Sequence, residues 1–343
     1  MAPTEILAQQ HFRTLSELLE PFGVKVCCLT GSIPKKERII IDEKIKSGEF
    51  HVVTGTHALI SDTTEFRRLG LVIMDEQHRF GVNQRAKLAQ KGMNPHRLVM
   101  SATPIPRTLA MIIYGDLDIS VLDELPRGRQ KIETFAVTDK LRERACGFVR
   151  KQLDEGRQAY IVCPMIEEDE NCLASAKSYA ENAAKNEFKD YTIGILHGKM
   201  SPQEKNEAMG RFKSGETQLL VATTVVEVGV DVPNATVIMI ENAERFGLSQ
   251  LHQLRGRVGR GSHQSYCILI AGNVSPETRE RLKIMTETSD GFKISEYDLK
   301  MRGAGDFFGE RQHGLPEMRL ADPSMDRQLI GTAQNAAKDC LLY

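Results

Sequence analysis

The sequence contains no tryptophan, and aromatic residues make up only 6% of its 343 positions. Proteins that hold single-stranded nucleic acid without sequence preference stack its bases on aromatic side chains, so a platform of this kind is poorly supported. An excess of one charge is also lacking, because 45 lysine and arginine residues face 46 aspartate and glutamate residues. A polyanionic partner must therefore be held by a local basic surface.

Other familiar signatures are missing too. None of the seven cysteines forms a Cys-x-x-Cys pair or has histidines at zinc-ligand spacing, which argues against a structural metal and a disulfide framework. No apolar run reaches the ~20 residues that a membrane helix needs, and the sequence starts without a signal-type segment. These absences predict a soluble protein of a reducing cytoplasm.

The sequence also lacks a phosphate-binding loop, and this absence has the clearest consequence for its chemistry. The pattern Gly-x-x-x-x-Gly-Lys-Ser/Thr does not occur, and its closest echo, residues 197–200, lacks both the first glycine and the final hydroxyl. Backbone amides of such loops cradle nucleotide phosphates. Any nucleotide site formed by these residues is therefore expected to be incomplete.

Short apolar runs alternate with longer segments whose apolar residues recur every three to four positions, which predicts parallel sheets covered by helices. Strands are expected at residues 24–29, 52–54, 71–74, 98–100, 134–137, 160–164, 192–197, 219–222, 237–240 and 266–270. Helices are expected at residues 4–19, 35–46, 139–155, 173–185, 202–214 and 249–255.

The alternation breaks near residue 125, where proline, glycine and charged residues mark a linker. We expect one α/β domain over residues 1–125, a linker over 126–131 and a second α/β domain over 132–274. Strand signals then fade, and residues 275–343 are predicted to form a charged helical extension. Two domains and an appendage fit the length, at ~100–200 residues per domain.

The first motif is an apolar strand that ends in two carboxylates, within Asp75-Glu76-Gln77-His78. This arrangement places Asp75 near a magnesium ion and lets Glu76 polarise an attacking water. Taken alone, an Asp-Glu pair after a strand is as readily a solvated turn or a helix cap. The continuation through Gln77 and His78 favours the hydrolytic interpretation.

Hydroxyl groups follow the next expected strand, in Ser101-Ala102-Thr103-Pro104. Small donors at a strand end can change partners as a cleft closes, which suits a link between hydrolysis and DNA position. A Ser/Thr cap before a helix that begins near Pro104 is the simpler alternative.

Residues 253–260 read Gln-Leu-Arg-Gly-Arg-Val-Gly-Arg and follow a helix that is rich in glutamine. The spacing can aim Arg257 and Arg260 at one phosphate chain, where guanidinium groups stabilise the charge of a transferring phosphoryl group. A basic loop that contacts nucleic-acid phosphate is favoured for this pattern on its own.

Residues 223–231 follow another buried strand and supply hydroxyls, a glycine and an acid. They suit a loop that touches both the DNA backbone and a nucleotide ribose. A glycine turn capped by Asp231 is the alternative.

In this order the motifs resemble those of the RecG family, bacterial ATP-dependent DNA helicases of superfamily 2. The resemblance extends over essentially every residue and adds two DNA-contact motifs, at residues 2–5 and 55–60. It implies two RecA-like motor domains that close on ATP and Mg²⁺, and branched double-stranded DNA as substrate, such as stalled forks and Holliday-type junctions. Single-strand DNA-binding protein is a further implied partner.

The resemblance also assigns roles to individual residues. Catalytic roles fall on Asp75, which also holds Mg²⁺, and on Glu76, Arg257 and Arg260. Nucleotide binding and coupling fall on Gln77, His78, Ser101, Thr103, Glu227, Gly229, Asp231 and Gln253. DNA contacts fall on Pro3, Thr4, Gly55, Thr56, Thr223 and Thr224.

Residues 290–314 of the extension resemble a translocation motif that the family shares with the transcription-repair coupling factor. The resemblance implies a helical hairpin and loop that follow the motor domains and push on duplex DNA, with Arg281, Arg302 and Gln312 taking part. A C-terminal helix packed only for stability is the alternative. Residues 55–60 and the Gln77-His78 ending favour RecG over the coupling factor. A non-catalytic DNA-binding fragment is the third interpretation.

Compared with the family pattern, the sequence lacks a fork-splitting domain, a strand and a phosphate loop ahead of Ala2. We expect this polypeptide to have little or no ATPase activity, although the protein that it represents hydrolyses ATP. Unpaired sheet edges should make the first domain the less stable one and favour self-association, with the intact protein a monomer. DNA contacts should go mostly to phosphate and sugar.

Overall fold

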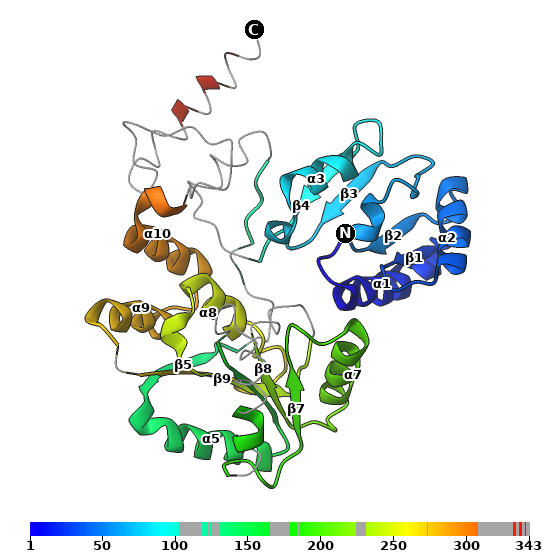
Figure 1. Ribbon diagram of the computed structural model, residues 1–343. Coiled ribbons are helices and arrows are strands. Elements are labelled where there is room, and N and C mark those ends of the chain that lie inside the picture. Colours follow the sequence, from blue (N-terminus) through cyan, green and yellow to red (C-terminus); the bar gives the residue numbers. More distant parts are fainter. Residues whose placement is uncertain are drawn as a thin grey trace. The chain divides into compact units, whose positions relative to one another are not determined.

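The computed structural model describes residues 1–102, 118–122, 124, 130–164, 179–183, 186–223, 231–272 and 274–307, with a few positions after residue 331. The chain divides into two compact units, the first made mainly of Met1–Ala102 and the second mainly of the residues that follow. Each unit is an α/β structure with parallel strands and covering helices (Figure 1), which confirms the predicted fold class.

The described strands of the first unit form two parallel pairs. β1 (Val26–Leu29) pairs with β2 (Val52–Gly55), and β3 (Leu71–Met74) pairs with β4 (His96–Val99). The strand at 71–74 has the predicted bounds, and the other three begin or end within two residues of prediction.

The amino terminus joins the two pairs at their carboxyl ends. The Met1 amino group donates to the Ile73 carbonyl at 2.7 Å, and the Met1 carbonyl accepts the Asp75 N–H at 3.0 Å. On the other side, the Ala2 N–H donates to the Gly55 carbonyl at 2.8 Å. Residues 1 and 2 therefore lie between β2 and β3 in the manner of a strand end.

Within residues 1–102, three α-helices accompany these strands: α1 (Glu5–Leu19), α2 (Lys35–Ser47) and α3 (Val82–Ala89). Short 3₁₀ turns, η1 (Glu20–Phe22), η2 (His57–Ile60) and η3 (Gln77–Arg79), follow α1, β2 and β3. The first two α-helices were predicted. The sequence did not predict α3, because its few apolar residues, set among amide and charged side chains, give no clear helical period.

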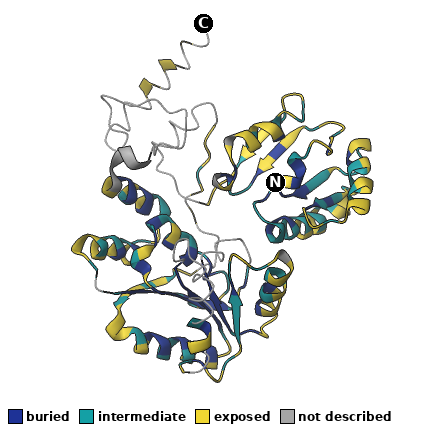
Figure 2. Ribbon diagram, in the orientation of Figure 1, coloured by how far each residue is buried: buried dark blue, intermediate teal, exposed yellow. Residues whose placement is uncertain are grey.

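One face of the second strand pair carries exposed apolar side chains. Along β3, Leu71 and Ile73 are 53% and 41% exposed, whereas Val72 and Met74 are 3% exposed. Leu98 on β4 is also exposed. Figure 2 shows this contrast with the second unit, whose sheet is buried along most of its length.

The second unit is built on a six-stranded parallel sheet with the strand order β5-β10-β9-β6-β8-β7. Its strands are β5 (Glu133–Thr138), β6 (Gln158–Val162), β7 (Ile193–Leu196), β8 (Leu219–Ala222), β9 (Ala235–Ile240) and β10 (Tyr266–Ala271). Every residue of β6, β8 and β9 is buried. Burial on both faces explains why these strands read as continuous apolar runs in the sequence.

The α-helices that the structure describes in full after residue 102 are α5 (Arg142–Asp154), α7 (Pro202–Lys213), α8 (Leu248–Arg255), α9 (Pro276–Glu287) and α10 (Gly291–Phe307). Two 3₁₀ turns, η4 (Asp139–Leu141) and η6 (Ala243–Arg245), precede α5 and α8. The extension is helical as predicted through α9 and α10. Most of the helix expected at residues 173–185 lies outside the described residues. No helix in the described ranges combines the length and apolar character needed to cross a membrane.

Candidate nucleotide and nucleic-acid site

Asp75 stands at the carboxyl end of β3 and uses both of its carboxylate oxygens. Oδ1 accepts the N–H of Glu76 at 3.0 Å, and Oδ2 lies 2.9 Å from Nε2 of His11 on α1. The hydrogen bond from His11 is the main cause that holds the pKa of Asp75 below its ordinary value. The side chain stays 23% exposed, so an ionised and accessible carboxylate is available to a hard cation.

Glu76 adopts the left-handed backbone conformation, with φ 50° and ψ 53°. This conformation is uncommon for a residue with a side chain, and strained positions of this kind cluster at functional sites. Its Oε2 accepts the N–H of Ala102 at 3.3 Å, and the Gln77 N–H donates to the Met100 carbonyl at 3.1 Å. The Asp75–His78 motif and the Ser101 segment are thus brought together within the first unit.

Gln77 turns its side chain inward. It is buried, and its Oε1 accepts a hydrogen bond from Nη1 of Arg85 on α3 at 3.1 Å. The backbone of His78 belongs to η3, but its side chain lies outside the described part, as does the whole of Thr103. Ser101 is exposed.

The expected DNA-contact residues of this unit occupy three kinds of position. Thr4 caps α1, because its Oγ1 accepts the N–H of Leu7 at 3.4 Å, and Pro3 precedes it. Gly55 ends β2, and its neighbour Thr56 is buried. Among the described residues, the Thr56 hydroxyl has no hydrogen-bond partner.

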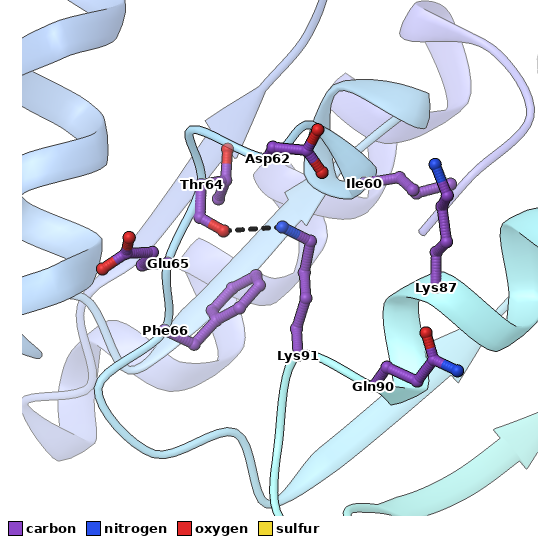
Figure 3. Close-up of a pocket in the computed structure, with 8 residues that line it drawn as sticks. All are labelled: Ile60, Asp62, Thr64, Glu65, Phe66, Lys87, Gln90 and Lys91. Carbon is purple, nitrogen blue, oxygen red and sulfur yellow. Dashed lines mark hydrogen bonds between the residues drawn. The ribbon is translucent and has the colours of Figure 1, made fainter.

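A pocket of about 440 Å³ opens on the same unit between the loop after η2 and the end of α3 (Figure 3). Lys91 donates from Nζ to the carbonyls of Ser61 and Thr64, at 2.7 and 2.8 Å. The ammonium group thus holds the loop at residues 61–64 in place. Ile60, the last residue of the predicted DNA-contact motif at 55–60, lines this pocket together with Asp62, Thr64, Glu65, Phe66, Lys87, Gln90 and Lys91. The residues to which individual roles were assigned lie elsewhere.

In the second unit, two residues predicted for the nucleotide site approach each other. Nη1 of Arg260 lies 3.7 Å from Oδ1 of Asp231, and Nε of Arg260 donates to the Gly256 carbonyl at 3.3 Å. Thr223 follows β8 and is buried, with no partner for its hydroxyl among the described residues. Three other predicted residues of this loop, Thr224, Glu227 and Gly229, lie outside the described residues.

Arg257 lies in the turn that follows α8 and is buried. Burial raises the pKa of the Tyr160 phenol on β6, and the positive charges of Arg257 and Arg260 act against that rise. Both positive charges therefore act on the same phenol, and their convergence on one phosphate chain stays a prediction. Gly259 between them has φ 76°, which favours glycine. Gln253 belongs to α8 and is half-buried.

Arg255 was missed by sequence reasoning, although it lies inside the motif. It is buried on α8, and its Nη1 donates to the carbonyls of Met285 and Thr288, at 2.8 and 2.9 Å. These carbonyls belong to the carboxyl end of α9, where a cation is favourable. The residue thus fastens α8 to the extension.

The predicted translocation residues are only partly described. Nη2 of Arg281 on α9 donates to the Glu244 carbonyl in η6, which adds a second tie between the extension and the sheet unit. The backbone of Arg302 lies in α10, its side chain is outside the described part, and Gln312 lies outside it altogether.

A polar network at the end of β9 was also missed. Arg142 on α5 donates to Glu241 at 2.9 Å, to the Tyr179 hydroxyl at 2.6 Å and to Glu187. Its members are scattered between residues 142 and 241, so no local pattern announces them. The network fixes α5 against the sheet.

Among the described residues, no group of three or more His, Cys, Asp or Glu side chains surrounds a common metal position. Mg²⁺ in phosphoryl-transfer sites is usually held by one or two carboxylates together with substrate phosphates and water. A single ionised carboxylate at Asp75 fits that pattern.

Three protein families match successive parts of the sequence. Residues 1–112 match the DEAD/DEAH box helicases, residues 140–262 the helicase conserved C-terminal domain, and residues 288–342 the C-terminal part of domain 3 of the ATP-dependent DNA helicase RecG. Together with the two RecA-like α/β units, these matches place the chain in the helicase class.

Individual relatives show which helicase family the chain belongs to. The ATP-dependent DNA helicase RecG of Bacillus subtilis is 51% identical over 338 residues, which cover 98% of this chain and 50% of that protein. RecG of Thermotoga maritima is 48% identical over 341 residues, which cover 99% of this chain and 44% of that protein. A structure of RecG bound to a three-way DNA junction matches with a TM-score of 0.76 and 46% identity, over 96% of this chain and 43% of that one. The chain belongs to the RecG family, and it spans about half the length of the curated relatives that it matches.

Proposed function

We propose that this chain is the motor portion of an ATP-dependent DNA helicase that remodels branched DNA in recombination and repair. The observation that carries the proposal is the arrangement at the end of β3, where Asp75 is ionised and the left-handed Glu76 accepts the Ala102 N–H at its carboxylate. The RecG structure with a three-way junction supports branched DNA as the substrate. Kinship with RecG favours this function over that of the coupling factor.

In this proposal Asp75 holds Mg²⁺, and Glu76 orients the attacking water and takes its proton. When bound, the metal neutralises charge on the nucleotide phosphates. Arg257 and Arg260 stabilise the charge of the transferring phosphoryl group, because guanidinium is a planar donor suited to phosphate. The remaining nucleotide-binding and coupling roles are those that the family resemblance implies.

DNA contact is proposed at Thr4, Thr56 and Thr223. Buried polar groups almost always have hydrogen-bond partners. The hydroxyls of Thr56 and Thr223 have none among the residues that the structure describes, which favours a ligand. The Thr4 oxygen accepts from Leu7 within the helix cap, which leaves its O–H to donate to a phosphate oxygen. Hydroxyl contacts of this kind carry no sequence information.

The extension is proposed to transmit motor movement to duplex DNA. Arg255 joins it to α8, the helix that precedes Arg257, and Arg281 joins it to η6. Arg302 and Gln312 are proposed to take part in translocation.

The test uses this chain fused behind the upstream half of the Bacillus subtilis relative, since the chain covers only half of that protein. Glu76→Gln keeps an acceptor for the Ala102 N–H but removes the base. We expect it to lower junction-stimulated ATP hydrolysis by about 100-fold or more. The matched control is Glu17→Gln on the exposed side of α1, which should leave the rate unchanged. Undiminished hydrolysis in the Glu76→Gln protein would refute the role of Glu76.

A further inference from the structure

The helix α1 connects two parts of the proposed site. Thr4, a proposed DNA contact, caps its first turn. Seven residues further along, His11 reaches the end of β3, where its Nε2 lies 2.9 Å from Oδ2 of Asp75. Family resemblance assigned a role to Thr4 and to Asp75, but none to His11.

The geometry of the helix makes this connection direct. Seven residues of α-helix are about two turns and about 10 Å, so Thr4 and His11 lie on the same face. The helix runs without a break from Glu5 to Leu19, with Leu7 and Ala8 buried. At its start, the Glu5 carboxylate accepts the N–H of Ser32 at 3.0 Å. A displacement at the first turn is therefore carried to His11 by a rigid element.

The hydrogen bond also controls how the Asp75 carboxylate is presented. An ionised carboxylate only accepts, so Nε2 of His11 carries the proton and donates. His11 occupies one lone pair of Oδ2, and the Glu76 N–H occupies one of Oδ1. The two donors fix the rotation of the carboxylate and so set the direction of its remaining lone pairs. Neighbouring groups that orient a metal ligand typically change metal affinity or activity by ~10- to 100-fold when removed.

We propose that His11 is a positioning residue that orients Asp75 for the metal ion and makes this orientation depend on DNA contact at the start of α1. The inference rests on the proposed function. It adds a route by which duplex DNA acts on the hydrolytic centre from within the first unit alone.

The test compares His11→Ala and His11→Gln in the fusion protein described above. Alanine removes the donor, whereas the amide of glutamine offers an N–H near the position of Nε2. Thr14→Ala is the matched control, one turn further along α1 and exposed. The readouts are Mn²⁺ binding by electron paramagnetic resonance in the presence of ADP, the Mg²⁺ concentration for half-maximal hydrolysis, and the ratio of junction-stimulated to unstimulated rates.

We expect His11→Ala to weaken Mn²⁺ binding and raise the Mg²⁺ requirement by about 10-fold, and to lower the stimulation ratio by a similar factor. His11→Gln should restore most of each loss, and Thr14→Ala should match the parent. Parental values in His11→Ala would overturn the proposal. An equal loss of the junction-stimulated and unstimulated hydrolysis rates, together with a lower melting temperature, would also overturn it if His11→Gln did not restore them. Glu76→Gln separates the two ideas, because persistent hydrolysis there contradicts the proposed function irrespective of His11.

Discussion

Gly55 is the residue of the site with the least room for change. A Cβ atom at this position would lie 2.2 Å from the carbonyl oxygen of Leu29, where β2 ends beside β1. Because the clash is with backbone, relief requires the strands to separate. We expect Gly55→Ala to lower the free energy of unfolding by about 3 kcal/mol, measured by urea titration of this chain. Gly70→Ala is the control, since a Cβ there has no neighbour within 4 Å. Equal stability of the two variants would contradict the packing argument.

Individual residues differ in how far the sequence could predict them. Asp75 and Glu76 follow a recognisable apolar strand, so their place at a sheet edge could be inferred from local pattern. His11 and Arg255 could not be assigned in this way, because their partners lie 64 and about 30 positions away. Tertiary packing, and not spacing, brings these groups together.

At the scale of elements, the junction of α8 with α9 is expected to respond to pH. Burial, with the charge of Arg255 acting in the same direction, lowers the pKa of His252 from 6.5 to about 4. The unfolded chain therefore binds a proton at a higher pH than the folded chain does. The stability due to neutral His252 is complete above pH 6.5 and falls as the pH drops toward 4, by ~1.4 kcal/mol per pH unit.

The measurement is the free energy of unfolding as a function of pH, in the parent and in His252→Gln. Glutamine keeps an oxygen to accept from Arg255 but does not titrate. The difference in free energy of unfolding between His252→Gln and the parent should change by about 3 kcal/mol between pH 6.5 and pH 4. His263→Gln, at an exposed histidine after α8, should retain the parental slope. Parallel curves for parent and His252→Gln would rule out the burial of a neutral imidazole.

The elements themselves were largely predictable. Buried strands such as β8 give short apolar runs bounded by polar residues, and all ten expected strands occur within two residues of their predicted bounds. The helix α3 escaped prediction, since Leu88 is the one clearly buried apolar side chain among its described residues. The predicted bounds of the two α/β domains, the linker and the extension stay predictions.

At the scale of the whole molecule, the two units are built on unequal cores. The second has a six-stranded sheet with three fully buried strands, whereas the first has two strand pairs with Leu71 and Ile73 exposed. We expect calorimetry to give two transitions, with the first unit melting first. Exposed apolar strands should also make the chain associate as its concentration rises.

Ile73→Thr should weaken that association in sedimentation velocity experiments, because it removes apolar surface from the exposed face. Leu141→Thr, at an exposed leucine of the second unit, is the control and should sediment like the parent. A single cooperative melt together with strictly monomeric sedimentation would contradict the unequal-core account.

The buried Arg255 also bears on how such proteins diversify. Its side chain belongs to α8, but the carbonyl groups that it satisfies belong to the end of α9. Exchange of the extension between homologues at residue 275 would therefore pair a buried cation with backbone carbonyls of another protein, whose positions depend on where the α9 of that protein ends. An exchange point ahead of α8 keeps them together. The extension is therefore best exchanged together with α8, which belongs to the second sheet domain.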